Sequence, residues 1–387
     1  MPADTGEVTL VMARRVEPGY EAAFEPWAKG ILDNVATSAG RLGYGLFRSF
    51  GDDTPGSSST VSGMRRPAGP GSSFHSDSAG RMGYHIVNAW GPYPMTSFQT
   101  AQFLQQGTAR DDYMLALPGL KYSAAVFSRT ADAMQMGKSL RGYRPGTSVK
   151  ADWFAPVQHP SVVPLSACPF CRSDVGVTFQ PALGGDSDPT HSLAFGLRRT
   201  WAFYRNGEQI TDNTKVFVPE RADYTLVSTD TRAADHGGVK LGGKVVTEYG
   251  FTSAAPKSME APGCTSAIPK ATVCEALPVI QPHYRMNASL LNEVAAGTRS
   301  TVTVDASRAH GFTGGSRMAG AKFSVSYDDG ATWKIADVDR VDENSFSARF
   351  TNAELSGSNG FVSIKAEAWD EPGNRTVQTV TRAYVLK

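Results

Sequence analysis

The sequence predicts an α+β protein, in which a mixed N-terminal unit precedes two β-sandwich-like domains. Three observations support this prediction. Residues 321–387 alternate apolar and polar side chains around Asp-Gly and Pro-Gly turns, which is typical of an antiparallel sheet with one buried face. Residues 1–135 combine such alternation with two stretches of helical spacing. A length of 387 residues is also more than one ordinary core accommodates.

The N-terminal unit is expected to run strand, helix, strand, strand, helix, strand. In the first helix Phe24, Trp27 and Ile31 recur at helical spacing, and the second helix is expected to begin at Thr96 or Ser97. The four strands are expected at residues 8–15, 42–50, 83–91 and 121–129. This order is the ferredoxin-like pattern. Helices cover one face of such a sheet and the other face must also be buried, so we expect a homodimer.

The remainder of the chain is expected to form strands and turns. A linker is expected at residues 136–150, a β-rich sandwich-like domain at 151–260, a Pro-rich connector at 261–282 and an Ig-like β-sandwich domain at 283–387. One hairpin is expected around Asn206-Gly207 and another around a two-residue Asp-Gly turn at Asp329-Gly330, because these residue types adopt positive φ at low cost.

Composition excludes several classes of partner. The 38 basic and 37 acidic residues nearly balance, which provides no electrostatic argument for nucleic acid or for an anionic membrane. The longest apolar runs are too short for a membrane-spanning helix, so no membrane insertion is expected. The opening residues MPADTGEVTLVMARRV lack the apolar segment of a signal peptide. This predicts a cytoplasmic protein, or a secreted one whose leader has been removed.

The N-terminal segment VTLVMARRVEPGYEAAFEPWAKGI and the strand YHIVNAW resemble antibiotic-biosynthesis-monooxygenase-type domains over residues 7–130. The resemblance implies a dimeric α+β barrel with a pocket between sheet and helices. Some members of that family oxidise polycyclic phenols with O₂ and without a cofactor, so no cofactor is expected here. Haem-degrading members carry an Asn on the first strand and a His on the second helix. This chain has Ala13 and the stretch Ala109-Arg110-Asp111 there, which argues against haem degradation.

The strand at 83–91 then provides the candidate site. His85 is the expected general base, because an O₂-dependent phenol oxidation needs a group that helps to deprotonate the substrate. Asn88 is expected to hold a substrate oxygen, whereas Trp27, Tyr84 and Trp90 would contact the aromatic ring. The alternative interpretation makes His85 part of a dimer contact and both tryptophans part of the core.

Residues 150–387 resemble the C-terminal accessory region of secreted actinobacterial subtilisin-like proteases. The similar segments include DWFAPVQHP, CPFCRSD, YRNG, EYGFTSAAP, YDDGATW and the closing QTVTRAYVLK. The catalytic domain of such proteases does not fit in this chain. Asp4, Ser148 and His236 resemble fragments of its triad, but they occur in the wrong order and without the flanking residues. Protease activity is therefore not expected.

Four cysteines leave several possibilities open. A redox pair at Cys168 and Cys171 would need a thioredoxin-like context that the sequence lacks. Four free thiols, a zinc site that adds Cys264 and Cys274, and two disulfides (168–171 and 264–274) remain possible. The resemblance to secreted proteins favours the disulfides.

Two acidic clusters are expected to bind no metal. Asp186, Asp188 and His191 lack the ligand series of a calcium loop and predict a solvated turn. The second cluster, Asp337, Asp339 and Asp342, predicts a polar strand edge.

The functional hypothesis is a cofactor-independent oxygenase acting on a small aromatic substrate. The alternative is a non-catalytic, secreted or structural binding protein whose N-terminal domain only dimerises.

Overall fold

A computed structural model provides the structure of the chain, which divides into two units, residues 1–69 and 70–387. The first unit lies outside the described residues, and with it the strands expected at 8–15 and 42–50 and the first expected helix. The structure describes residues 72–74, 81–90, 100–105, 107–110, 120–128, 134–137, 142–143, 150–160, 168–180, 184–193, 198–211, 220–232, 240–258, 263–264, 268, 270–315 and 317–387.

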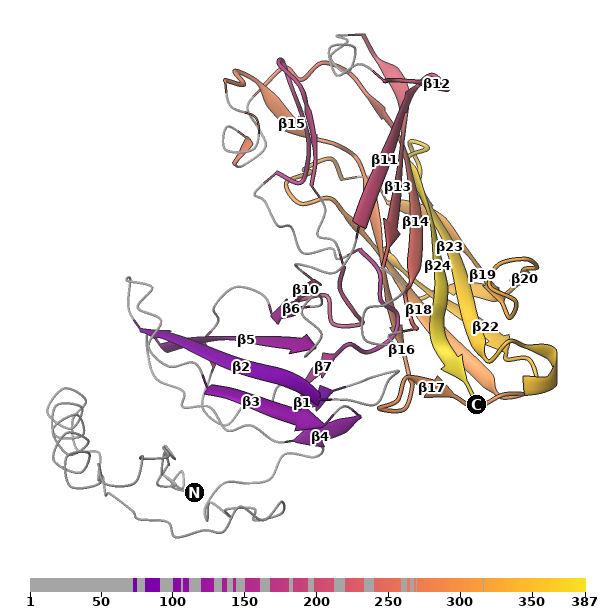
Figure 1. Cartoon of the computed structure of the whole chain (residues 1–387). Helices are drawn as coiled ribbons and strands as arrows, with labels where there is room; N and C mark the ends of the chain where they lie inside the picture. Colours follow the sequence, from indigo (N-terminus) through magenta and orange to yellow (C-terminus); the bar gives the residue numbers. More distant parts are fainter. Residues whose placement is uncertain are drawn as a thin grey trace, which may run out of the picture. The chain divides into compact units, whose positions relative to one another are not determined.

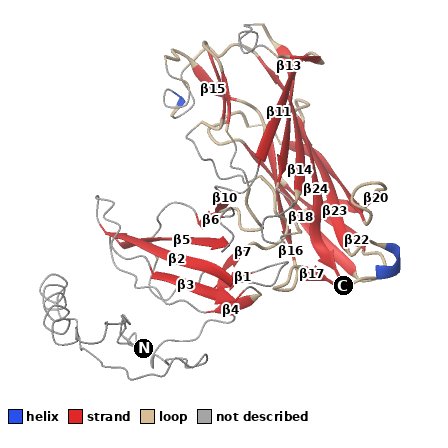
Figure 2. Ribbon diagram, in the orientation of Figure 1, coloured by secondary structure: helices blue, strands red, loops and turns tan. Residues whose placement is uncertain are grey.

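The described part of the chain is almost entirely β, which overturns the expected α+β, ferredoxin-like fold (Figure 2). The strands expected at 83–91 and 121–129 are present as β2 (Arg81–Trp90) and β5 (Leu120–Ser128). The second expected helix is wrong, because its residues form β3 (Thr100–Gln105) and β4 (Thr108–Arg110). Its apolar residues fit a period of two nearly as well as a helical one, and pairing with β2 satisfies the backbone of β3. No helix among the described residues is long and apolar enough to cross a membrane.

Two small sheets contain the first described strands. One has the order β4-β1-β7 and the other the order β10-β6-β5-β2-β3. The strands not yet given are β1 (Ser72–Phe74), β6 (Met134–Gly137), β7 (Ala151–Trp153) and β10 (His191–Leu193).

A nine-stranded sheet dominates the rest of the described chain, in the order β12-β11-β13-β14-β24-β23-β19-β20, with β17 beside β24 (Figure 1). Its strands are β11 (Arg198–Arg205), β12 (Glu208–Gln209), β13 (Ala222–Thr231), β14 (Lys244–Ser253), β17 (Glu293–Val294), β19 (Met318–Ser326), β20 (Lys334–Ile335), β23 (Phe361–Asp370) and β24 (Arg375–Leu386). Because β14 pairs with β24, one sheet contains strands from both regions that the sequence assigns to separate sandwiches.

The expected turns are found at their expected places. Asn206 and Gly207 join β11 to β12 with φ of 49° and 82°, which confirms the first hairpin. Asp329 and Gly330 also have positive φ, at 57° and 99°. The loop from β19 to β20 is longer than the predicted two residues, because Asp328 accepts hydrogen bonds from the backbone nitrogen and hydroxyl of Thr332. A hydrogen bond from the hydroxyl of Ser326 (2.7 Å), together with these bonds from Thr332, lowers the pKa of Asp328 to about 2.

Two further sheets pack against the nine-stranded sheet, with an apolar core between each of them and that sheet. The sheet β15-β8-β9 contains β8 (Phe170–Ser173), β9 (Val177–Phe179) and β15 (Cys274–Ala276). The sheet β16-β18-β22-β21 contains β16 (Ile280–Met286), β18 (Arg299–Arg308), β21 (Asp337–Arg340) and β22 (Ser345–Thr351), and the short 3-10 turn η2 (Leu355–Gly357) follows it. Phe170 packs with Tyr224 and Tyr249 in one core, and Phe323 packs with Ile364 and Tyr384 in the other. The β-sandwich character expected for this region is therefore present.

Candidate functional site

The expected oxygenase residues lie on one described strand. Tyr84, His85, Asn88 and Trp90 occupy positions of β2, where His85 pairs with Ala125 of β5 and with Ala101 of β3. His85 and Asn88 are three positions apart, and positions an odd number apart in a strand belong to opposite faces of the sheet.

Trp27 lies outside the described residues, as do Asp4, Ser148 and His236. The helix that was expected to complete the pocket lies there too. The described residues therefore provide one strand of the pocket that the sequence predicts, and they leave the role of each of its residues a prediction.

A buried Asp–His cluster replaces the solvated turn expected at residues 186–191. Asp186 and His191 are almost fully buried, and His191 Nδ1 lies 3.0 Å from Asp186 Oδ1. The same carboxylate accepts hydrogen bonds from the backbone nitrogens of Phe154 (2.7 Å) and Asp188 (2.9 Å). The ring of His191 stacks on Trp153 at a centroid distance of 3.9 Å. The prediction of solvation is wrong here, because these side chains fasten the segment at 150–160 to the one at 184–193.

This cluster has a structural role. Because Asp186 already accepts from two backbone nitrogens and one imidazole, its charge is compensated within the protein. The second ring nitrogen of His191 lies 3.5 Å from Asp188 Oδ2. The cluster thus pairs one imidazole with two carboxylates, and it holds two chain segments together in the interior. The other acidic group behaves as expected, since Asp337, Asp339 and Asp342 lie exposed along or beside the edge strand β21.

All four cysteines are bridged. Cys168 pairs with Cys171 and Cys264 with Cys274, at Cα–Cα distances of 5.7 and 6.3 Å, which lie in the usual range for disulfides. This confirms the disulfide interpretation. Apolar neighbours, which include Ala271 and the half-buried Ile268, surround the cysteines. The Cys264–Cys274 bridge fastens β15 to the loop that contains Cys264, whereas the Cys168–Cys171 bridge closes a short loop at the start of β8.

The outer face of the nine-stranded sheet carries a group of side chains that sequence reasoning missed. Trp369 of β23 lines an open hollow of about 270 Å³ together with Lys322, Glu367, Gly373 and Arg375. The indole lies against the backbone of Gly320 on β19, where an added Cβ would come within 2.5 Å of the ring. Lys322 Nζ lies 5.4 Å from the centre of the indole. The glycine therefore leaves the space that the ring occupies.

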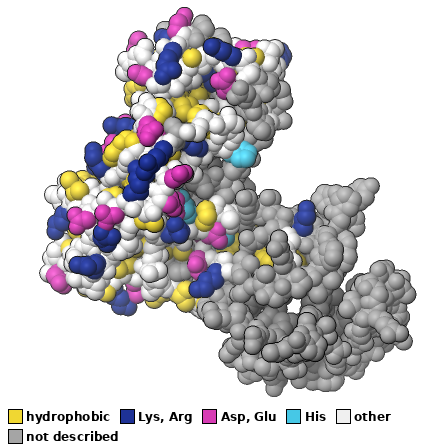
Figure 3. Space-filling view, turned by 180° about the vertical axis from the view of Figure 1, so that it is seen from behind, with side chains coloured by type: hydrophobic (Ala, Val, Ile, Leu, Met, Phe, Trp, Pro, Cys, Tyr) yellow, Lys and Arg dark blue, Asp and Glu magenta, His cyan; other side chains and the backbone are white. Residues whose placement is uncertain are grey.

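Charged side chains form a row beside this indole, which we call the charge ladder: Lys322, Glu367, Arg375 and Glu248. Lys322 Nζ and Arg375 Nη1 lie 3.8 and 3.7 Å from the carboxylate of Glu367, and Arg375 Nη2 lies 3.5 Å from Glu248. Alternation in β23 explains the row, because Val362, Ile364, Ala366 and Ala368 face the core. The informative signal in the sequence was a tryptophan at an outward position of this strand. Figure 3 shows acidic and basic side chains interspersed over the described part of one face.

No protein-family model matches the chain, and no curated protein matches it significantly.

Proposed function

We propose that the β-rich part of this chain is a non-catalytic binding module of a secreted protein, and that the hollow at Trp369 binds a saccharide. The observation that carries the proposal is the flat indole of Trp369, which lies on Gly320 and is bordered by charged hydrogen-bonding groups. A sugar ring has an apolar C–H face and a rim of hydroxyl groups. An aromatic face with polar groups around it complements both.

Two further observations support the proposal. Disulfides persist in oxidising surroundings, and all four cysteines of the chain are bridged. The hollow also lies on strands of a large sheet with a packed core, which fixes its side chains better than a mobile loop would. The resemblance of residues 150–387 to the accessory region of secreted proteases fits a binding role beside another activity.

The cofactor-independent oxygenase hypothesis stays a prediction. It depends on Trp27, which lies outside the described residues, and on a pocket whose second wall was to be helical. The expected homodimer also stays a prediction, which sedimentation of the full chain at micromolar concentration tests. The binding proposal needs neither of them.

Titration of the full chain with soluble polysaccharides tests the proposal. Neutral, acidic and basic polymers are compared by affinity electrophoresis and then by calorimetry. We expect at least one polymer to bind, and Trp369→Ala to weaken that binding about 5-fold or more, because stacking on an aromatic side chain contributes about 1 kcal/mol or more.

Trp333→Ala is the matched control. Trp333 is also partly buried and also faces a lysine, since Lys365 Nζ lies 4.3 Å from its ring centre, but it is not part of the hollow. Binding should survive this change. Failure of every polymer to bind wild type, or equal loss in the two variants, would overturn the proposal.

A further inference from the structure

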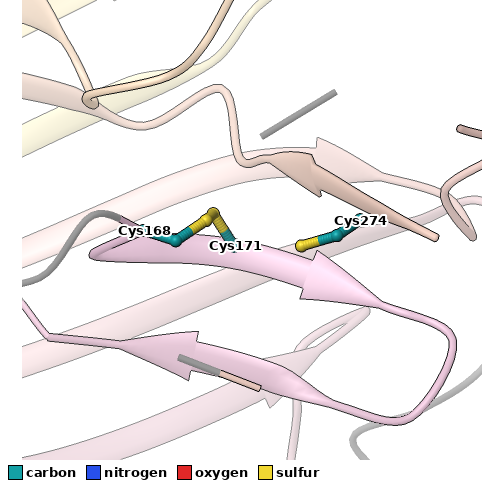
Figure 4. A group of neighbouring side chains, drawn as sticks. All are labelled: Cys168, Cys171 and Cys274. Atoms are coloured by element: carbon teal, nitrogen blue, oxygen red, sulfur yellow. A yellow bond between two sulfur atoms is a disulfide. The ribbon is translucent and has the colours of Figure 1, made fainter. Parts of the chain in front are cut away.

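The two disulfides lie in contact with each other, which their bonding alone does not require. The Sγ atoms of Cys168, Cys171 and Cys274 all lie within 4.8 Å of one another (Figure 4). Cys264 is bonded to Cys274. Strand pairing explains the approach, because β15 runs antiparallel to β8 and places Ala276 beside Cys171. Three sulfur atoms thus gather at one buried point, and the fourth, from Cys264, is bonded to one of them.

From this convergence we propose that the cysteine cluster is a redox-switched metal site, which binds one Zn²⁺ through four thiolates after both disulfides are reduced. In a tetrahedral zinc site with Zn–S bonds of ~2.3 Å, the sulfur atoms lie roughly 3.8 Å apart. Three of the four sulfur atoms, those of Cys168, Cys171 and Cys274, already lie within 4.8 Å of one another, so the bonded pairs would have to separate and Cys264 Sγ would have to move toward the other three. Breaking the two S–S bonds frees each sulfur to make this shift.

The ligand chemistry favours zinc over other common ions. A C-x2-C pair such as Cys168 and Cys171 is a usual half of a structural zinc site, and soft thiolates select zinc over magnesium or calcium. The group found among the described residues contains cysteine only, with no carboxylate or imidazole. Its apolar surroundings (Ile268, Ala271 and Ala276) would also protect bound thiolates from water.

The redox step balances with a thiol reductant, such as a cellular dithiol. Each disulfide takes up two electrons and two protons from one dithiol, which becomes a disulfide itself. Two dithiols therefore convert the cluster into four thiols. Zinc then binds the four deprotonated sulfurs, and up to four protons are released. In oxidising surroundings the reverse reaction expels the metal and restores both bridges.

The test compares oxidised and reduced full-length protein. Each form is incubated with Zn²⁺, freed of excess metal on a desalting column, and analysed for zinc and for thiols that alkylate. We expect the oxidised form to retain no zinc. The reduced form should retain one Zn²⁺ per chain, with four thiols that alkylate at least ~10-fold more slowly until a strong chelator removes the metal. Co²⁺ in place of Zn²⁺ should give the absorption of a tetrahedral thiolate complex.

Two double variants separate a four-thiolate site from weaker binding. Replacing Cys168 and Cys171 by serine, or Cys264 and Cys274 by serine, should each weaken zinc retention by the reduced protein at least ~100-fold. Circular dichroism follows the β signal throughout. Reduced protein that loses this signal should regain it with zinc. The proposal is overturned if reduced wild type retains no zinc, if zinc does not restore a lost signal, or if either double variant retains zinc as well as wild type.

Discussion

Nε2 of His159 lies 3.3 Å from Nδ1 of His283 in the interior of the protein. The other nitrogen of each ring faces a backbone carbonyl, since His159 Nδ1 lies 2.9 Å from Val157 O and His283 Nε2 lies 3.0 Å from Ser187 O. A carbonyl oxygen only accepts hydrogen bonds, so both of these ring nitrogens carry their hydrogen. In two neutral rings, the facing nitrogens therefore carry none.

Burial keeps this histidine pair neutral. Burial, together with the nearby His283 and against the effect of the Val157 carbonyl, lowers the pKa of His159 to about 3. Burial also lowers the pKa of His283, although the Ser187 carbonyl and the carboxylates of Asp305, Asp186 and Asp188 act in the opposite direction. The folded protein thus binds fewer protons here than the unfolded chain does.

This difference predicts acid sensitivity. Unfolded histidines titrate near pH 6.5, whereas folded His159 titrates near pH 3. Unfolding therefore takes up protons in this window, and the free energy of unfolding should fall as the pH drops from about 6.5, by up to ~1.4 kcal/mol per pH unit for each proton. Denaturant titrations at intervals from pH 8 to pH 4.5 measure this slope.

His159→Gln tests the origin of the slope. The variant removes one titrating group, so its slope between pH 6.5 and 4.5 should be smaller by about one proton. His310→Gln is the matched control, because it makes the same substitution at an exposed position. Equal slopes in wild type and His159→Gln would contradict the explanation.

The Asn206-Gly207 turn gives a second prediction. Gly207→Ala should lower the free energy of unfolding by about 1 kcal/mol, because φ at this position is +82° and an alanine there is strained. Nothing lies within 4 Å of the added Cβ, so the loss would come from the backbone alone. Gly357→Ala is the matched control, since Gly357 is equally open and its φ is not positive, and it should change stability little. Equal effects of the two changes in thermal unfolding would exclude backbone strain as the cause.

The strands of the large sheet were predictable, and the partners of those strands were only partly so. β23 and β24 alternate apolar and polar residues around a turn, and such local patterns are visible in the sequence. The pairing of β14 with β24 joins residues more than a hundred positions apart, and no local pattern records it. The helix predicted over residues 100–105 was wrong for a related reason, since this short apolar run fits a strand once β2 lies beside it.

The candidate sites, too, were only partly predictable from the sequence. The disulfide pairs were predictable from cysteine spacing and resemblance, but the contact between the two bridges depends on the pairing of β8 with β15. The burial of Asp186 and His191 was not predictable, because it depends on Trp153 and Phe154, more than thirty positions away. Polar residues in a Gly-rich turn usually indicate a solvated loop, and only the tertiary structure reverses that expectation.

The third prediction concerns the disulfides in the oxidised protein. In the chain-entropy description, a bridge that closes a longer loop stabilises more, so the ten-residue separation of Cys264 and Cys274 should contribute about 2–3 kcal/mol. The three-residue separation of Cys168 and Cys171 should contribute roughly 1 kcal/mol less. Double alanine variants of each pair, compared by denaturant unfolding without reductant, measure both contributions. The reverse order would indicate that packing around the cysteines outweighs chain entropy.

The last prediction concerns a buried ion pair next to the proposed saccharide site. Asp370 follows Trp369, its side chain is fully buried, and Oδ2 lies 2.6 Å from Arg308 Nη1. The carboxylate also accepts hydrogen bonds from the backbone and side-chain nitrogens of Asn374, which fixes the turn from β23 to β24. Asp370→Ala leaves a largely buried guanidinium without this carboxylate and should cost about 3–5 kcal/mol of stability.

The neighbouring Glu371→Ala is its control, because Glu371 is exposed in the same turn and should matter by less than ~0.5 kcal/mol. Denaturant unfolding of both variants compares these costs. Since Gly373 and Arg375 flank Asn374 and line the hollow, Asp370→Ala should also weaken any saccharide binding at temperatures where the variant remains folded. Unchanged stability in Asp370→Ala would mean that the ion pair does not hold this turn.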